Sequence, residues 1–200
     1  MTKAGKGRDF SDMNDMGMGE EAPTVTLTDE QGRSLLCYVE HALEVDGTEY
    51  MLLLPVDSPI EIFAWAVDDE DEEVETLVDL ADDEVDSVFE TAKAVLAEQD
   101  LTLKRTAFTL TAAGDLPEID EEEVITLDLS EEEDGAESEQ FQRITFFYHE
   151  EQAYDICTPL DPLLFFARRN AQGGADLLSP EEFMAVRSQL EEQLFDALDE

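Results

Sequence analysis

The chain has very few basic residues. It carries 11 Lys and Arg against 53 Asp and Glu, which gives a formal net charge of −42 over 200 residues. No Lys or Arg lies between Arg33 and Lys93, nor between Arg105 and Arg143. Such a field repels nucleic-acid phosphates and anionic lipid, so we expect no direct nucleic-acid binding and no membrane insertion. It favours basic partners, polyamines or divalent cations, although a solvated, soluble surface is a sufficient explanation for many acidic proteins.

Cysteine and histidine are also scarce. Cys37 and Cys157 are the only cysteines, and each lies in an apolar, strand-like run outside any C-x-x-C motif. We expect two buried thiols rather than a disulfide. His41 and His149 are the only histidines, too few for a zinc site. No EF-hand, phosphate loop, H-E-x-x-H or G-x-S-x-G motif is present, so we expect no enzyme activity, no metal and no cofactor.

Long apolar runs are missing as well. No segment approaches the ~20 apolar residues that span a bilayer. Lys3, Lys6 and Arg8 have no apolar stretch behind them, which argues against a secretory signal. Residues 1–23 hold four glycines, four methionines and few large apolar side chains, so they are predicted to be a disordered leader. Together these features predict a cytoplasmic protein, or one of the plastid stroma if the source bears plastids.

The chain does contain a repeated motif. Tyr50-Met-Leu-Leu-Leu-Pro-Val-Asp57 returns without a gap as Tyr154-Asp-Ile-Cys-Thr-Pro-Leu-Asp161. Upstream, Val25-Thr-Leu-Thr28 is similar to Phe108-Thr-Leu-Thr111, and each copy ends in an acidic amphipathic pattern. Internal repetition predicts repeated structural units. We expect an α+β fold of two divergent repeats, each an antiparallel β-meander or hairpin sheet closed by one C-terminal amphipathic helix.

The first unit is predicted to span residues 24–100. Alternating apolar and polar residues indicate strands, and Asp46-Gly47 is typical of a tight hairpin turn. Pro55 lacks an N–H and is expected to end its strand or mark an edge. A helix is predicted near 82–98, because apolar residues recur there at helical spacing, with Asp82 as a candidate cap.

The second unit is predicted to span residues 101–200. It contains an acidic insertion, 115–140, with thirteen acidic residues and no basic one. Val124–Leu129 within the insertion has the pattern of a strand, and we expect its flanks to be mobile. A hairpin is predicted around Glu150–Gln152. A final helix is predicted near 180–198, because Ser179-Pro-Glu-Glu182 combines a capping box with proline at the first helical position.

Two resemblances follow from these motifs. Residues 24–98, with Thr24-Val-Thr-Leu-Thr28 and Glu44-Val-Asp-Gly47 before the Pro55-Val-Asp57 motif, resemble the YrzB-like family of small acidic bacterial proteins. Residues 103–198, with Tyr154-Asp-Ile-Cys-Thr-Pro-Leu-Asp-Pro162 and Leu178-Ser-Pro-Glu-Glu-Phe183, resemble a domain found in cyanobacteria and plastids. Neither resemblance implies an activity or a catalytic residue.

These observations favour a non-enzymatic acidic interaction protein, an accessory or assembly factor that binds a basic protein surface. The plastid-type resemblance implies photosynthetic-complex or ribosome assembly as the setting. One alternative is a nucleic-acid mimic that occupies a phosphate-binding groove, and another is an enzyme that uses a carboxylate pair with a metal ion. Specific binding requires apolar anchors within the acidic field. The candidate contacts, for which core packing is the alternative, are Ile60, Ile62, Phe63, Trp65, Phe165, Phe166, Arg168 and Arg169.

Overall fold

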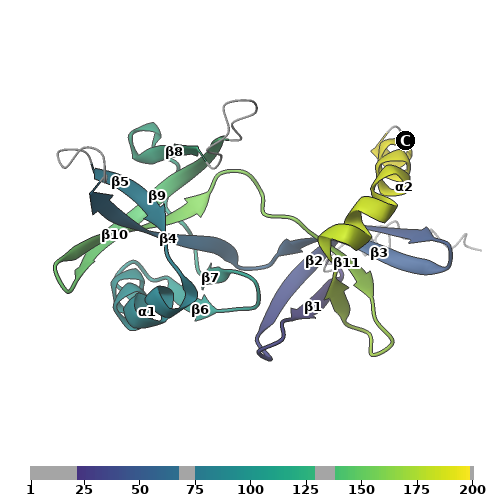
Figure 1. Cartoon of the computed structure of the whole chain (residues 1–200), viewed down its shortest axis with the longest axis horizontal. Coiled ribbons are helices and arrows are strands. Elements are labelled where there is room, and N and C mark those ends of the chain that lie inside the picture. The colour runs from purple at the N-terminus through teal and green to yellow at the C-terminus, as the bar shows by residue number, and fades with distance from the viewer. Residues whose placement is uncertain (1–21, 68–74, 129–137, 199–200) are drawn as a thin grey trace, which may run out of the picture.

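The computed structural model describes residues 22–67, 75–128 and 138–198. These residues form a mostly β, α+β structure in which a small barrel and a larger open sheet lie at opposite ends of the long axis (Figure 1). The barrel strands are β1 (Thr24–Thr28), β2 (Ser34–Val45), β3 (Thr48–Pro55), β11 (Phe165–Arg169) and β12 (Ala175–Leu177). The open-sheet strands are β4 (Ser58–Val67), β5 (Glu75–Asp79), β6 (Thr102–Arg105), β7 (Leu110–Ala113), β8 (Val124–Asp128), β9 (Ser138–His149) and β10 (Gln152–Pro159). The helices are α1 (Asp82–Ala97), α2 (Pro180–Leu198) and the 3-10 turn η2 (Glu121–Glu123).

The barrel closes in the order β1-β12-β11-β3-β2. β1 and β12 are parallel and meet at Leu27 and Ala175, and the other neighbours are antiparallel. Apolar residues alternate with polar ones along β1, which turns one face of the strand inward. α2 packs outside the barrel, where the ring of Phe183 lies 4.7 Å from that of Phe166. The buried barrel core is Val25, Leu27, Leu35, Cys37, Met51, Leu53, Ala107, Ala167 and Ala175.

The open sheet runs β6-β7-β4-β10-β9-β8, and β5 also pairs with β4. α1 covers one face, where its Val88, Ala92 and Leu96 pack in the same core as Ile60 and Ile156. This stripe is the one expected from the helical spacing of apolar residues. The opposite face carries a smaller core of Phe63, Phe141 and Cys157.

Each sheet combines strands from both halves of the chain. β4 leaves the β2–β3 hairpin and pairs with β10, while β11 leaves the β9–β10 hairpin and pairs with β3. This differs from our expectation that each sheet is built from one contiguous unit. Prolines flank both crossings, Pro55 and Pro59 at the first and Pro159 and Pro162 at the second. Proline keeps the preceding residue extended, which disfavours a tight return onto the strand just completed.

The two crossings use the same strand register. In the open sheet Ala64 pairs with Tyr154, and in the barrel Arg168 pairs with Tyr50. Both members of the second pair lie 104 residues from their counterparts in the first, Tyr50 to Tyr154 and Ala64 to Arg168. Each strand therefore meets its partner from the other half of the chain in an equivalent way.

The two long hairpins also match. Each turns through two residues with positive φ, Asp46–Gly47 and Glu150–Glu151, the geometry of a type I′ turn. Each has one extra residue at a bulge, Glu40 in β2 and Ile144 in β9, and these too are 104 residues apart. The hairpin predicted at Asp46-Gly47 is confirmed, as is Pro55 at the end of its strand. That the two groups of strands are copies of one unit stays a prediction.

One part of our alignment of the two predicted repeats was wrong. Thr24–Thr28 pairs with β2 as β1, and the strand in the equivalent place beside β9 is Val124–Asp128 rather than the segment at 108–111. Phe108 lies in a loop at φ 66°, and Leu110 begins β7. The strand predicted within the acidic insertion is thus confirmed as β8.

The helix starts were predicted in part. The N-cap of α1 is Ala81 rather than Asp82, and the Glu84 side chain accepts the Ala81 N–H at 2.9 Å. The capping box of α2 is confirmed: Glu182 N–H donates to Ser179 Oγ at 3.2 Å, and Ser179 N–H donates to the Glu182 carboxylate at 3.0 Å. The predictions for the leader up to residue 21, the acidic turn at 68–73 and the insertion at 130–137 lie outside the described residues.

Candidate functional site

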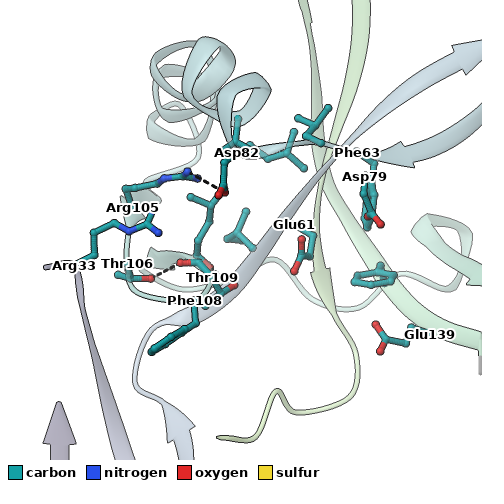
Figure 2. Close-up of a pocket in the computed structure, with 16 residues that line it drawn as sticks. Arg33, Glu61, Phe63, Asp79, Asp82, Arg105, Thr106, Phe108, Thr109 and Glu139 are labelled. Carbon is teal, nitrogen blue, oxygen red and sulfur yellow. Dashed lines mark hydrogen bonds and ion pairs between the residues drawn. The ribbon is translucent and has the colours of Figure 1, made fainter. Parts of the chain in front are cut away.

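A cavity of about 510 Å³ lies at a break along the edge of β4. β7 pairs with β4 through Ser58–Ile60 and β5 pairs with it through Phe63–Val67 on the same side. Among the described strands none pairs with Glu61 and Ile62 on that edge. Successive side chains of a strand point to opposite faces, so Glu61 lies on the face away from Ile60, Ile62 and α1. Figure 2 shows Glu61 near the middle of the site, with Asp79 and Glu139 on one side and Arg33 and Arg105 on the other.

The two arginines of the cavity already have acidic partners. Arg33 Nε lies 2.6 Å from Asp29 Oδ2, and Asp29 also accepts the backbone N–H of Arg33 at 2.9 Å. Arg105 lies 3.4 Å from Asp82 and 3.3 Å from Asp86, both at the start of α1 (Figure 2). The first pair stabilises the loop after β1, and the second joins the end of β6 to the start of α1.

The acidic side of the cavity holds Glu61, Asp79 and Glu139, which come from β4, β5 and β9. The Glu61 residue is open to the cavity, yet the surrounding walls desolvate its carboxylate. This desolvation, with the charge of Asp79 and then that of Glu139, raises the pKa of Glu61 to about 7. A positively charged group that enters here would favour the ionised form of Glu61.

Positions 104 residues apart in the matched strands explain why this sheet has a cavity. Leu35 and Met51 are buried in the barrel core, and Val39 and Phe165 pack against it. The residue of the open sheet that corresponds to each of these four apolar residues is charged. Ionised side chains resist burial in an apolar core, so the open sheet cannot fill its inner face as the barrel does. The corresponding residues, in the order Leu35, Val39, Met51 and Phe165, are Glu139, Arg143, Asp155 and Glu61.

The edge strands also differ between the closed barrel and the open sheet. β1 and β12 close the barrel by pairing with each other. Their counterparts β8 and β5 each pair with one strand, and within the described ranges they do not pair with each other. Leu77 of β5 and Ile125 of β8 nonetheless pack against the same small core. The part of the open sheet that runs β5-β4-β10-β9-β8 thus has the strand order of the barrel without its closure.

Asp155 is the most buried of these charged residues. It is 2% exposed, and its Oδ2 atom makes no hydrogen bond. The nearest cation is Arg143, whose Nη1 lies 3.8 Å away and whose Nη2 lies 2.6 Å from Glu123. A buried carboxylate with so little compensation lowers stability. Departures from packing rules of this kind are expected at functional positions.

The first group of predicted contact residues is mostly core. Ile60, Ile62 and Phe63 are buried, and they lie at the wall of the cavity, so their contact with a partner stays a prediction. They alternate between the two faces of β4 and fill the core on each side. Trp65 is half-buried, and its backbone carbonyl accepts a hydrogen bond from the side-chain amide of Gln152.

The second group lies in the barrel, on a different sheet from the first. Phe165 and Phe166 are half-buried, Phe165 against the barrel core and Phe166 against α2. Arg168 and Arg169 are exposed but have partners within the chain. Arg168 Nη1 lies 2.7 Å from Glu182, and Arg169 binds Glu49 through Nε at 2.9 Å and Nη2 at 3.0 Å. The structure does not bring the two groups together.

Sequence reasoning missed Glu61, Asp79, Glu139 and Asp155. A signal for one of them was present, because the gap-free motif alignment already places Asp155 on Met51, a charged residue on an apolar one. The others could not be found this way, because the cavity depends on which strands become neighbours.

Other chemistry is limited in the part of the chain that the structure describes. No group of three or more His, Cys, Asp or Glu side chains there could hold a metal ion. No helix there is both long and apolar enough to cross a membrane. Cys37 and Cys157 are free and buried, and burial raises their pKa values to about 11 and about 12.

Comparison with known proteins places the chain in a family. A family model described as "Protein of unknown function (DUF1292)" matches residues 30–97, and one described as "Protein of unknown function (DUF3727)" matches residues 100–197. A UPF0473 protein of Desulforudis audaxviator (strain MP104C) is 44% identical over 69 residues, which cover 32% of this chain and 77% of that relative. The chain belongs to the UPF0473 family. A second UPF0473 protein, from Clostridium botulinum (strain Loch Maree / Type A3), is 34% identical over 68 residues, covering 34% of this chain and 80% of the relative. No solved structure matches the chain.

The matched segments do not coincide with the sheets. The segment at 30–97 supplies β2 and β3 to the barrel but β4 and β5 to the open sheet. The segment at 100–197 supplies β8, β9 and β10 to the open sheet but β11 and β12 to the barrel. In this member of the UPF0473 family, both segments are therefore needed to build either sheet.

Proposed function

We propose that this protein is a non-enzymatic interaction protein, an acidic accessory or assembly factor that binds a basic protein surface. One observation carries the proposal: charged side chains occupy inner-face positions of the open sheet at which the barrel has apolar core residues. A net charge of −42 supports it, because a strong acidic field speeds encounter with a basic surface.

The cavity suits a Lys or Arg side chain of the partner. Arg33 and Arg105 are already paired, whereas Glu61, Asp79 and Glu139 share one wall. An arginine that entered would offset the like-charge repulsion among these carboxylates and form charge-assisted hydrogen bonds with them. The proposed role of Glu61 is to receive that cation in its ionised form.

The proposal also covers the relation between the two halves of the chain, their families and the cellular setting. We propose that β1–β5–α1 and β8–β12–α2 are divergent copies of one unit, supported by the shared register, turn and bulge. We propose that the first copy belongs with YrzB-like small acidic proteins and the second with a cyanobacterial and plastid domain. The setting would then be photosynthetic-complex or ribosome assembly, in the cytoplasm or the plastid stroma.

The test is affinity capture from cells of the source organism with the full chain as bait. The cavity variant is Glu61→Gln with Glu139→Gln. The matched control is Glu40→Gln with Glu44→Gln, which removes the same charge from exposed positions of β2. We expect a basic protein to be captured at low salt by the wild type and the control, and to be lost from the cavity variant. Equal capture by the two variants, or capture of proteins without a basic surface, would refute the proposal.

A further inference from the structure

One edge of β9 is open. β8 pairs with β9 only through Ser138–Gln142, whereas β10 pairs with it along Phe141–His149. From Arg143 onward, no strand in the described part of the chain pairs with the outer edge of β9. A groove of about 370 Å³ lies beside this edge, between β9 and the segment at 117–123. Unpaired strand edges are sites at which another chain can add a strand.

The turn after β9 decides which backbone groups face the open edge. His149 and Gln152 flank the two-residue turn and therefore form a hydrogen-bonded pair. Along an antiparallel ladder, alternate residues direct their N–H and C=O groups to opposite neighbours. The backbone groups of Phe146 and Tyr148 consequently point away from β10, toward the open edge.

The side chains at this edge are exposed aromatics. Phe146 is 57% exposed and Tyr148 is 68% exposed, and their rings meet edge to face at 6.2 Å. The corresponding positions on β2 of the barrel, 104 residues earlier, are Ala42 and Glu44. The barrel has an equivalent strand edge there without the aromatic side chains, so the aromatic pair is particular to the open sheet.

The far wall of the groove is acidic and held in place. Gln142 donates its side-chain amide to the carbonyl oxygens of Pro117 at 3.3 Å and Glu118 at 2.9 Å. Glu118, Asp120 and Glu123 line the groove opposite β9, and the one cation that lines it, Arg143, is paired with Glu123. The charge of the groove therefore complements a basic segment.

We propose that an extended basic segment of the partner protein adds as a strand to the open edge of β9. Its backbone would bond the outward N–H and C=O groups of Phe146 and Tyr148. Arginine side chains on one face would stack on the two rings, and others would meet Glu118 and Asp120 across the groove. This inference rests on the proposed function, because it takes the same basic class of partner and states how that partner is held.

The probe is a labelled ten-residue peptide of alternating arginine and valine, added to the full chain. Amide hydrogen exchange reports the new backbone bonds directly. We expect exchange at Phe146 and Tyr148 to slow at least tenfold at saturation, while exchange at Ala42 and Glu44 stays unchanged. Equal slowing at both edges, or none at Phe146 and Tyr148 when the peptide is bound, would overturn the inference.

Substitution gives a second measurement. Phe146→Pro removes an outward N–H, and we expect it to weaken peptide binding at least tenfold in fluorescence anisotropy. Ala42→Pro makes the same change at the corresponding barrel position and should leave binding unchanged. Phe146→Ala keeps the N–H and should fall between the two. Equal affinity of the Phe146→Pro and wild-type chains would contradict strand addition.

Three further outcomes bear on this inference and on the proposed function. If Glu61→Gln with Glu139→Gln abolishes peptide binding and Phe146→Pro does not, the peptide enters the cavity; the proposed function then stands and strand addition falls. If neither the peptide nor a basic cellular protein binds, both fall. If sedimentation shows a dimer that Phe146→Pro dissociates, the edge is occupied by a second copy of the chain, which overturns the basic-partner assignment.

Discussion

Glu139 takes in the open sheet the place that Leu35 takes in the barrel. Leu35 pairs with Leu27 on β1, and Glu139 pairs with Leu127 on β8. Leu35 is 2% exposed in a closed core, whereas Glu139 lines the cavity beside Glu61. A carboxylate at this position disfavours closure of the sheet over its inner face, because burying its charge without a partner is unfavourable.

The Arg143–Asp155 contact gives a stability prediction. Arg143→Val leaves Asp155 buried without a cation, so we expect the free energy of unfolding to fall by about 1–3 kcal/mol, the cost of leaving a buried polar group unsatisfied. The double variant Arg143→Val/Asp155→Met reproduces the barrel residues Val39 and Met51 and should recover most of that loss. Urea denaturation midpoints measure both changes. If the double variant is no more stable than the single one, Asp155 does not carry the buried-charge cost.

Glu61 should make stability depend on pH in an unusual direction. Its pKa is about 7 in the folded protein against an ordinary value of 4.5, so between these values the folded state binds more protons than the unfolded state. The contribution of Glu61 to stability is therefore lost as pH rises from about 4.5 to about 7. Glu61→Gln removes this effect, and its melting temperature relative to the wild type should climb across that window and level off above it. A difference that does not change with pH would contradict the raised pKa.

The strand exchange predicts how a fragment behaves. Residues 22–97 retain β1–β5 and α1 but lack β10, the partner of β4. Because β4 pairs with β10 in the register that β11 uses on β3, a second copy of the fragment can supply the missing hairpin. We expect the fragment to sediment as a dimer at micromolar concentration. A folded monomer would show that β4 turns back onto its own hairpin.

The net charge of −42 predicts a salt effect on the whole fold. Self-repulsion weakens the compact state, and added salt screens it. We expect the melting temperature to rise between low salt and ~0.15 M, where the Debye length falls below ~10 Å. A relief of ~1 kcal/mol corresponds to about 2–4 °C at this chain length. A flat or falling melting temperature in differential scanning calorimetry would count against repulsion as an important term.

Short-range features of this protein were determined by the sequence alone. The type I′ turn at Asp46–Gly47, the strand end at Pro55 and the capping box at Ser179 each depend on the conformational preferences of a few adjacent residues. The apolar stripe of α1 and the alternation of β1 are likewise local patterns. The motif copies at Tyr50 and Tyr154 also identified the two strands whose ladders match.

Only the tertiary structure decided which strands become neighbours. Alternation assigns a face to each residue of β4, but it fits pairing with β3 as well as with β10, so the exchange between the halves has no signature in periodicity. The cavity follows from that exchange, because Glu61, Asp79 and Glu139 meet only when β4, β5 and β9 join one sheet. The same pairing buried Ile60, Ile62 and Phe63, and it left the edge of β9 at Phe146 and Tyr148 open. Contacts between residues far apart in the chain depend on the packing of the whole molecule, and that packing decided where its charged and aromatic surfaces lie.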